Sequence, residues 1–264
     1  MTDTRLNDIL RQFAVVVTAI AQVYVSYAIG RDVGTIAQEN RSIILPATYA
    51  FAIWGLIFLL SLIYAIYQAL PANRESPILR AIGWWSAGAF LCNTAWNPIY
   101  INRQFVLSQV VILCGVLCAG MAYFRFVRAA TPARLTAIDT WVVAPALGLL
   151  FGWLTAANVV GLASVFVANG FAATGQGAET GGAALLLFGG AVAFFVVVFT
   201  RSGPTTAWAA YGAAVIWALI AVYLELRNAS MLVGVAAILG IVLIAVALVG
   251  PWSSTPRTRL PAAG

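Results

Sequence analysis

The stretch that decides the fold class is PATYAFAIWGLIFLLSLIYAIYQA, residues 46–69, which contains no charged side chain. A helix needs about 20 apolar residues to cross a bilayer, so this run is long enough to span one. The run is continuously apolar and does not alternate as the strands of a membrane barrel do. A helix is therefore the structure that satisfies its backbone groups in lipid.

The rest of the chain repeats this pattern. Only 8% of the 264 residues are charged and 62% are hydrophobic, whereas soluble domains are about 25% charged. Charges, prolines and glycine clusters separate apolar segments that are each long enough to span, at 13–30, 46–69, 81–101, 105–124, 141–169, 183–200, 206–224 and 230–249. We therefore expect an all-α, polytopic integral membrane bundle of about eight transmembrane helices, with no large soluble domain.

The charged residues indicate a topology and exclude a nucleic-acid partner. All 14 basic residues are arginines, and they lie between apolar segments instead of along one helical face. With eight spans, four of them (Arg31, Arg41, Arg103, Arg227) fall on one side and the other ten on the side of both termini. The positive-inside rule then places both termini in the cytoplasm.

The residue inventory argues against an enzyme. The chain has no histidine and no lysine, which removes histidine metal sites, Ser/His/Asp systems and Schiff-base lysines. Cys92, Cys114 and Cys118 lie inside predicted spans, and further ligands beside them are missing, so we expect them to pack as small apolar groups. We predict no catalytic residue and no metal site.

Polar and large aromatic side chains inside spans are the candidates for function, because they are costly in lipid. Asn93, Trp96, Asn97 and Tyr100 recur at helical spacing and share one stripe. This stripe is either a ligand wall or a set of interhelical amide bonds with an interfacial aromatic belt, and we assign Tyr100 to the belt.

Two other segments add candidates. Tyr49, Ala50 and Trp54 make the outer end of segment 46–69 aromatic, and segment 141–169 contributes Trp153 and Asn158. Gly148 and Gly152 in the latter segment form a pair that lets another helix approach closely.

Three motifs resemble one family. The sequence from Pro46 through Phe51 to Trp54 is similar to the second-helix signature of the tryptophan-rich sensory protein, or translocator protein, family (TspO/MBR). LCNTAW (residues 91–96) and WLTAA (residues 153–157) resemble two further motifs of that family, in the family's order.

The resemblance implies a fold and a site. Family members have five transmembrane helices around a cavity for porphyrins and other flat apolar molecules. It implies a five-helix core in residues 1–170. Outside that core, the apolar pattern and the arginine placement predict a glycine-rich outside loop at 171–182, three additional transmembrane helices in 183–250 and a cytoplasmic tail at 251–264. With the polar and aromatic candidates above, the predicted ligand-binding residues are Tyr49, Ala50, Trp54, Asn93, Trp96, Asn97, Trp153, Ala157 and Asn158.

The implied function is ligand binding in a membrane. We expect a sensor, receptor or scavenger for a porphyrin-like or other flat apolar molecule, with no required cofactor and a porphyrin or haem-type molecule as the ligand. A small-molecule transporter or channel and a structural or assembly factor are the alternatives. The expected location is the bacterial inner membrane, with the lipid bilayer as a partner, and a homodimer is left open.

Overall fold

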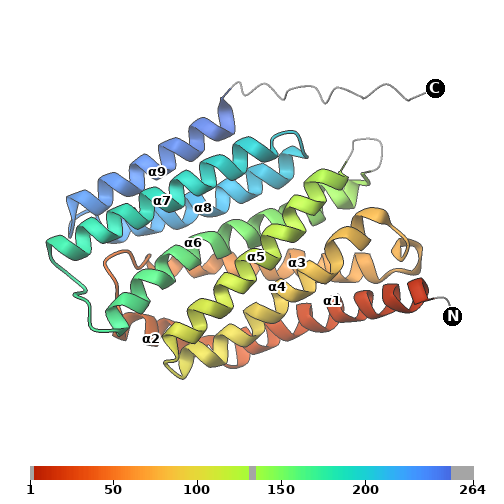
Figure 1. Ribbon diagram of the computed structural model, residues 1–264, viewed down its shortest axis with the longest axis horizontal. Helices are drawn as coiled ribbons and strands as arrows, with labels where there is room; N and C mark the ends of the chain where they lie inside the picture. The colour runs from red at the N-terminus through yellow and green to blue at the C-terminus, as the bar shows by residue number, and fades with distance from the viewer. Residues whose placement is uncertain (1–2, 131–134, 251–264) are drawn as a thin grey trace.

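A computed structural model describes residues 3–130 and 135–250 of the chain. Within these ranges every regular element is a helix, which confirms the prediction of an all-α membrane bundle (Figure 1). The long helices are α1 (Asp3–Ala28), α3 (Ile53–Ala69), α4 (Pro77–Ile101), α5 (Phe105–Ala129), α6 (Ala144–Ala168), α7 (Gln176–Thr200), α8 (Thr205–Leu226) and α9 (Met231–Val249).

Seven of these helices in the described ranges are long and apolar enough to cross a membrane. The exception, α4, has 25 residues like α5 but carries the two amides Asn93 and Asn97. Short elements complete the chain: α2 (Val33–Glu39), three 3-10 turns at Gly30–Asp32, Thr48–Ala52 and Pro71–Asn73, and a π-helical turn at Asp139–Val143 that leads into α6.

Successive long helices run in opposite directions, so α1 begins and α9 ends at the same end of the bundle (Figure 1). We call this the arginine-rich end, because Arg5 and Arg11 lie in the first three turns of α1 and Arg80 in the first turn of α4. The other end, which carries α2 and the connections α4–α5, α6–α7 and α8–α9, is the α2 end. Both ends of the described chain therefore lie on one side of the bundle, as eight spans require.

A buried charge network ties α1 to α4 at the arginine-rich end. Asp8 and Arg11 are 3% and 1% exposed, and their side chains lie 3.7 Å apart. Arg80 donates to both carboxylate oxygens of Asp8, and Arg11 donates to the carbonyl oxygens of Leu79 and Arg74 at 3.1 and 2.8 Å. These contacts explain why α1 begins ten residues before the predicted segment 13–30: its polar first turns are buried by partners and are not a loop.

Close packing of α6 against α8 joins the last helices to the first. A Cβ atom on Gly148 or Gly152 would overlap the backbone of α8 at Ala207 or Tyr211. This confirms the predicted close approach at the two glycines and identifies α8 as the partner helix.

A second contact with α8 lies at the start of α3. The Trp217 indole donates to the carbonyl oxygen of Ala50 at 2.9 Å, and the Ala47 amide donates to the carbonyl oxygen of Ala221 at 3.3 Å. The division of the chain at residue 170 stays a prediction, and these contacts cross it.

The glycine-rich loop is shorter than predicted. Helix α7 begins at Gln176, so residues 176–182 are helical and the expectation of a loop over 171–182 is wrong for them. Gly175 has a φ of +91°, and a Cβ on Gly182 would overlap Ile43 and Ile44, so one glycine permits a turn and the other a close contact. The predicted tail at 251–264 lies outside the described residues.

Candidate functional site

A cavity of about 440 Å³ lies inside the bundle toward the α2 end. Residues of α1, α2, α3, α4, α5, α6 and α8 and of the turn at Thr48–Ala52 line it. Cavities that bury small molecules typically measure about 300–1,000 Å³, so this one has the size of a ligand site.

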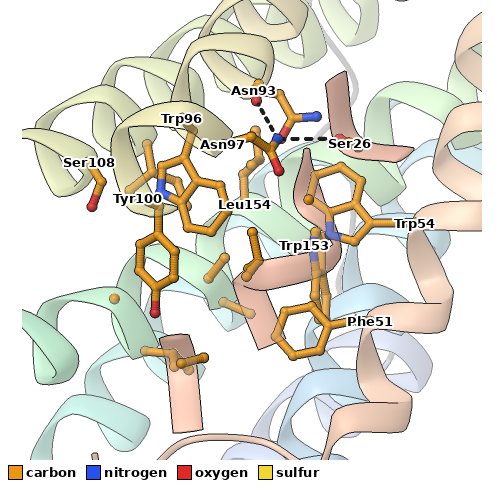
Figure 2. Close-up of a pocket in the computed structure, with 18 of the residues that line it drawn as sticks. Ser26, Phe51, Trp54, Asn93, Trp96, Asn97, Tyr100, Ser108, Trp153 and Leu154 are labelled. Carbon is orange, nitrogen blue, oxygen red and sulfur yellow. Dashed lines mark hydrogen bonds between the residues drawn. The ribbon is translucent and has the colours of Figure 1, made fainter. Parts of the chain in front are cut away.

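One wall of the cavity is a cluster of three aromatic rings from the turn at Thr48–Ala52, from the start of α3 and from α6, drawn at the right of Figure 2. Trp153 meets Phe51 and Trp54 edge-on, with ring centroids 5.9 and 6.2 Å apart, and is only 3% exposed. Trp54 also stacks on Phe58 at 5.1 Å. These mutual contacts fix the ring orientations, so the wall is preformed.

A second aromatic group comes from α4 and α5 and lies on the other side of the view in Figure 2. Trp96 and Tyr100 stack with centroids 4.6 Å apart, and Phe105 meets Tyr100 edge-on at 5.5 Å. Tyr100 is 8% exposed and lines the cavity. The assignment of Tyr100 to an interfacial belt is therefore wrong, because α2 and the start of α5 cover this turn of α4.

The amides of α4 form a polar edge between these walls. The Asn97 amide donates to the Ser26 hydroxyl at 3.3 Å and to the carbonyl oxygen of Asn93 at 3.1 Å (Figure 2). Asn93 donates to the Gln22 side chain at 3.2 Å. The amides thus bond α4 to α1, as the interhelical interpretation of the stripe predicts. Both also line the cavity, and their contact with a ligand stays a prediction.

The structure brings six of the nine predicted ligand-binding residues to the cavity wall. The six are Trp54, Asn93, Trp96, Asn97, Trp153 and Ala157. Their contact with a ligand stays a prediction.

The other three residues are absent from the described wall. Tyr49 is 43% exposed and packs edge-on against Trp217, with ring centroids 5.5 Å apart. Ala50 is fully buried. The Asn158 side chain accepts a hydrogen bond of 2.8 Å from Gln109, and Gln109 lines the cavity in its place.

Sequence reasoning missed the residues that close the α2 end of the cavity. Val33, Gly34 and Ala37 lie on α2, a helix of seven residues inside a segment that we expected to be a loop. Such a short helix forms through tertiary contacts, and nothing in its composition marks it. Ser26 and Gln109 were also missed, because a single polar residue in a span has no partner that the sequence identifies.

The described part of the cavity wall carries no charged side chain. Two ion pairs lie at the α2 end, Arg103 with Glu39 at 2.5 Å and Arg41 with Glu225 at 2.6 Å. In the described ranges no three His, Cys, Asp or Glu side chains lie close enough to hold a metal ion. The described wall of the cavity is therefore uncharged and rich in aromatic side chains.

The cavity is uncovered on one side, between α1 and α3. Tyr27 of α1 is 63% exposed, and Ala52 and Gly55 at the start of α3 are also exposed, although all three line the cavity. A Cβ on Gly55 would meet no atom within 4 Å. These exposed lining residues lie at the last turn of α1 and around the start of α3.

A family comparison covers nearly the whole chain. The model of the family described as TSPO-like protein matches residues 8–250. The matched residues run through α7, α8 and α9, which the motif resemblance had left outside a five-helix core. No curated protein and no solved structure matches the chain. On the match over residues 8–250, the chain belongs to the TSPO-like protein family.

Proposed function

We propose that this protein binds a flat apolar small molecule, porphyrin-like in shape, in the cavity, and acts as a sensor, receptor or scavenger for it. The observation that carries the proposal is the pair of aromatic walls around about 440 Å³ of space in a membrane-embedded bundle. Membership of the TSPO-like family supports a ligand-associated role in the membrane.

The energetics of the walls favour a flat ligand. An aromatic contact contributes about 0.5–1.5 kcal/mol beyond the area that it buries. A planar molecule between Trp54 and Trp153 on one side and Trp96 on the other gains several such contacts at once. Because the rings hold one another in place, little ordering free energy is lost on binding.

The packing toward the arginine-rich end supports binding over conduction through a pore. Tyr64 and Phe90 are 0% and 1% exposed, and the Tyr64 hydroxyl bonds to the Ser86 hydroxyl at 2.8 Å. Beyond them lies the buried pair of Asp8 and Arg11. A channel would need a path through these layers.

The ligand-binding proposal has a direct test in the full-length protein. A porphyrin ester titrated into protein in nanodiscs should quench tryptophan fluorescence in a saturable way. Ala157→Phe places a ring in the cavity and should abolish saturable quenching, whereas Ala213→Phe adds the same ring at an exposed position of α8 and should leave it unchanged. Equal quenching in both variants would refute binding in this cavity.

We also propose that the protein lies in the bacterial inner membrane with both termini in the cytoplasm, which would place the cavity in the outer half of the bilayer. The arginine excess at the end where α1 begins supports this orientation. Reporter fusions at residue 264 should report a cytoplasmic location, and an external reporter signal would reverse the orientation.

A further inference from the structure

We infer that the cavity selects an uncharged flat ligand that carries an oxygen acceptor on its edge, and rejects the same ring system bearing free carboxylates. This inference rests on the proposed function and specifies the ligand class. It follows from two independent features of the wall: its lack of charge and its unused hydrogen-bond donors.

The first feature is electrostatic. Among the described residues that line the cavity, the polar side-chain groups are hydroxyls, amides, indoles and the thiol of Cys92, and none is an acid or a basic group. A carboxylate that enters such a cavity loses its hydration and gains no cation, which costs far more free energy than a neutral amide or hydroxyl can return. An ester of the same acid carries no such penalty.

The arginines of the α2 end whose side chains are described do not compensate: Arg227 is exposed and outside the described cavity wall, and the other two are engaged by carboxylates of the protein. Arg103 and Arg41 each donate to a carboxylate of the protein, Glu39 and Glu225. A ligand carboxylate would have to displace one of these partners, and the displaced glutamate would then lose its own counter-charge.

The second feature is the set of unused donors. The indole N–H groups of Trp54 and Trp153 and the hydroxyl of Tyr100 make no hydrogen bond with any described residue, although all three residues line the cavity. Trp153 is 3% exposed, so its donor has little access to water outside the cavity. A donor left without a partner in such a place favours a ligand that brings an acceptor.

The two indole donors lie on one wall. The ring centroids of Trp54 and Trp153 are 6.2 Å apart, and Figure 2 draws their nitrogen atoms on neighbouring edges of the two rings. An ester or ketone oxygen of the ligand at this wall would meet an indole donor, while the ring system of the ligand lies toward Trp96. The flat aromatic surface of the wall and its indole donors thus favour the same ligand, a flat molecule with an oxygen acceptor on its edge.

The experiment compares three porphyrins of one ring system on the full chain in phosphatidylcholine nanodiscs, with empty nanodiscs correcting for partition into lipid. Protoporphyrin IX dimethyl ester carries neutral acceptors, protoporphyrin IX carries two carboxylates, and etioporphyrin carries neither. We expect the ester to bind at least tenfold more tightly than the free acid.

A variant separates the donor from the ring. Trp153→Phe keeps an aromatic ring but removes the N–H group, and should weaken the ester by about two- to tenfold. Etioporphyrin has no edge oxygen and should bind wild type and Trp153→Phe equally. Equal losses for both ligands would mean that Trp153 acts through packing alone and would overturn the donor assignment.

Other outcomes distinguish this inference from the function on which it rests. Free acid that binds as tightly as the ester, and is blocked by Ala157→Phe, would overturn the inference and leave the proposed function standing. Loss of that binding in Arg31→Gln would identify Arg31, which follows Gly30 of the cavity wall in sequence, as the cation. If Ala157→Phe blocks none of the three porphyrins, the proposed function itself is wrong.

Discussion

Replacing Trp153 by leucine tests whether the aromatic walls bind ligand or only fill space. Leucine is at least as apolar as tryptophan, so α6 should remain inserted. The substitution removes the ring that meets Phe51 and Trp54 edge-on at 5.9 and 6.2 Å. A flat ligand then loses one aromatic contact and part of its buried area, which we put at about 1–2 kcal/mol. The expected loss of affinity is about five- to thirty-fold.

The measurement is a titration of porphyrin ester followed by the absorbance of the porphyrin, because the protein fluorescence itself changes when a tryptophan is replaced. Trp141→Leu is the matched control: Trp141 precedes α6 in the same span but is 71% exposed, so its replacement should leave affinity unchanged. Trp96→Leu, on the other wall, should lose affinity as Trp153→Leu does. Equal affinity in wild type and all three variants, or an equal loss at Trp141, would show that these tryptophans are packing residues.

Three further predictions concern stability and assembly. Gly152→Ala should lower the free energy of unfolding by about 1–3 kcal/mol, and with it the melting temperature in detergent, because its Cβ would overlap the α8 backbone. Gly181→Ala is the control: its Cβ would meet no atom within 4 Å, so the melting temperature should not fall. Equal melting temperatures of the two variants would contradict this prediction. Asp8→Asn should destabilise the fold by about 3 kcal/mol by leaving Arg11, 1% exposed, without its carboxylate, and an unchanged thermal melt would show that the pair is dispensable. A chain ending at residue 175 should aggregate on size-exclusion chromatography because α6 loses α8, and a monodisperse product would instead establish the five-helix unit over 1–170 as independent.

Hydropathy predicted the helices well because lipid imposes one rule on every span. Each expected segment corresponds to a long helix, and segments such as 206–224 differ from α8 by only a residue or two at each end. The predictions are wrong where contacts with side chains distant in sequence determine the length of a helix. The sequence placed Asp8 and Arg11 before the first predicted segment, 13–30. In the structure both are buried in α1, because Arg80, more than sixty residues away in sequence, pairs with Asp8.

The residues of the candidate site could be predicted where they belong to a sequence motif of the family. Trp54, Trp96 and Trp153 were identified from three motifs in order, and the structure brings all three to one cavity. Ala50 sits in one of those motifs, yet its carbonyl oxygen binds Trp217 and its side chain is buried away from the described cavity wall. The spacing of a motif in the sequence predicts which helix a residue lies on. Whether the residue faces the cavity depends on the rotation of that helix, which is set by packing against helices that are distant in sequence.

The uncovered side of the cavity, at Tyr27, Ala52 and Gly55, changes what an affinity for this protein means. A ligand that passes between α1 and α3 arrives from the hydrocarbon, so the concentration that governs occupancy is its mole fraction in the bilayer and not its molarity in water. Diluting the protein in more lipid would then weaken apparent binding without any change at the site. A molecule that partitions strongly into membranes would reach the cavity by two-dimensional diffusion, at a rate set by membrane fluidity.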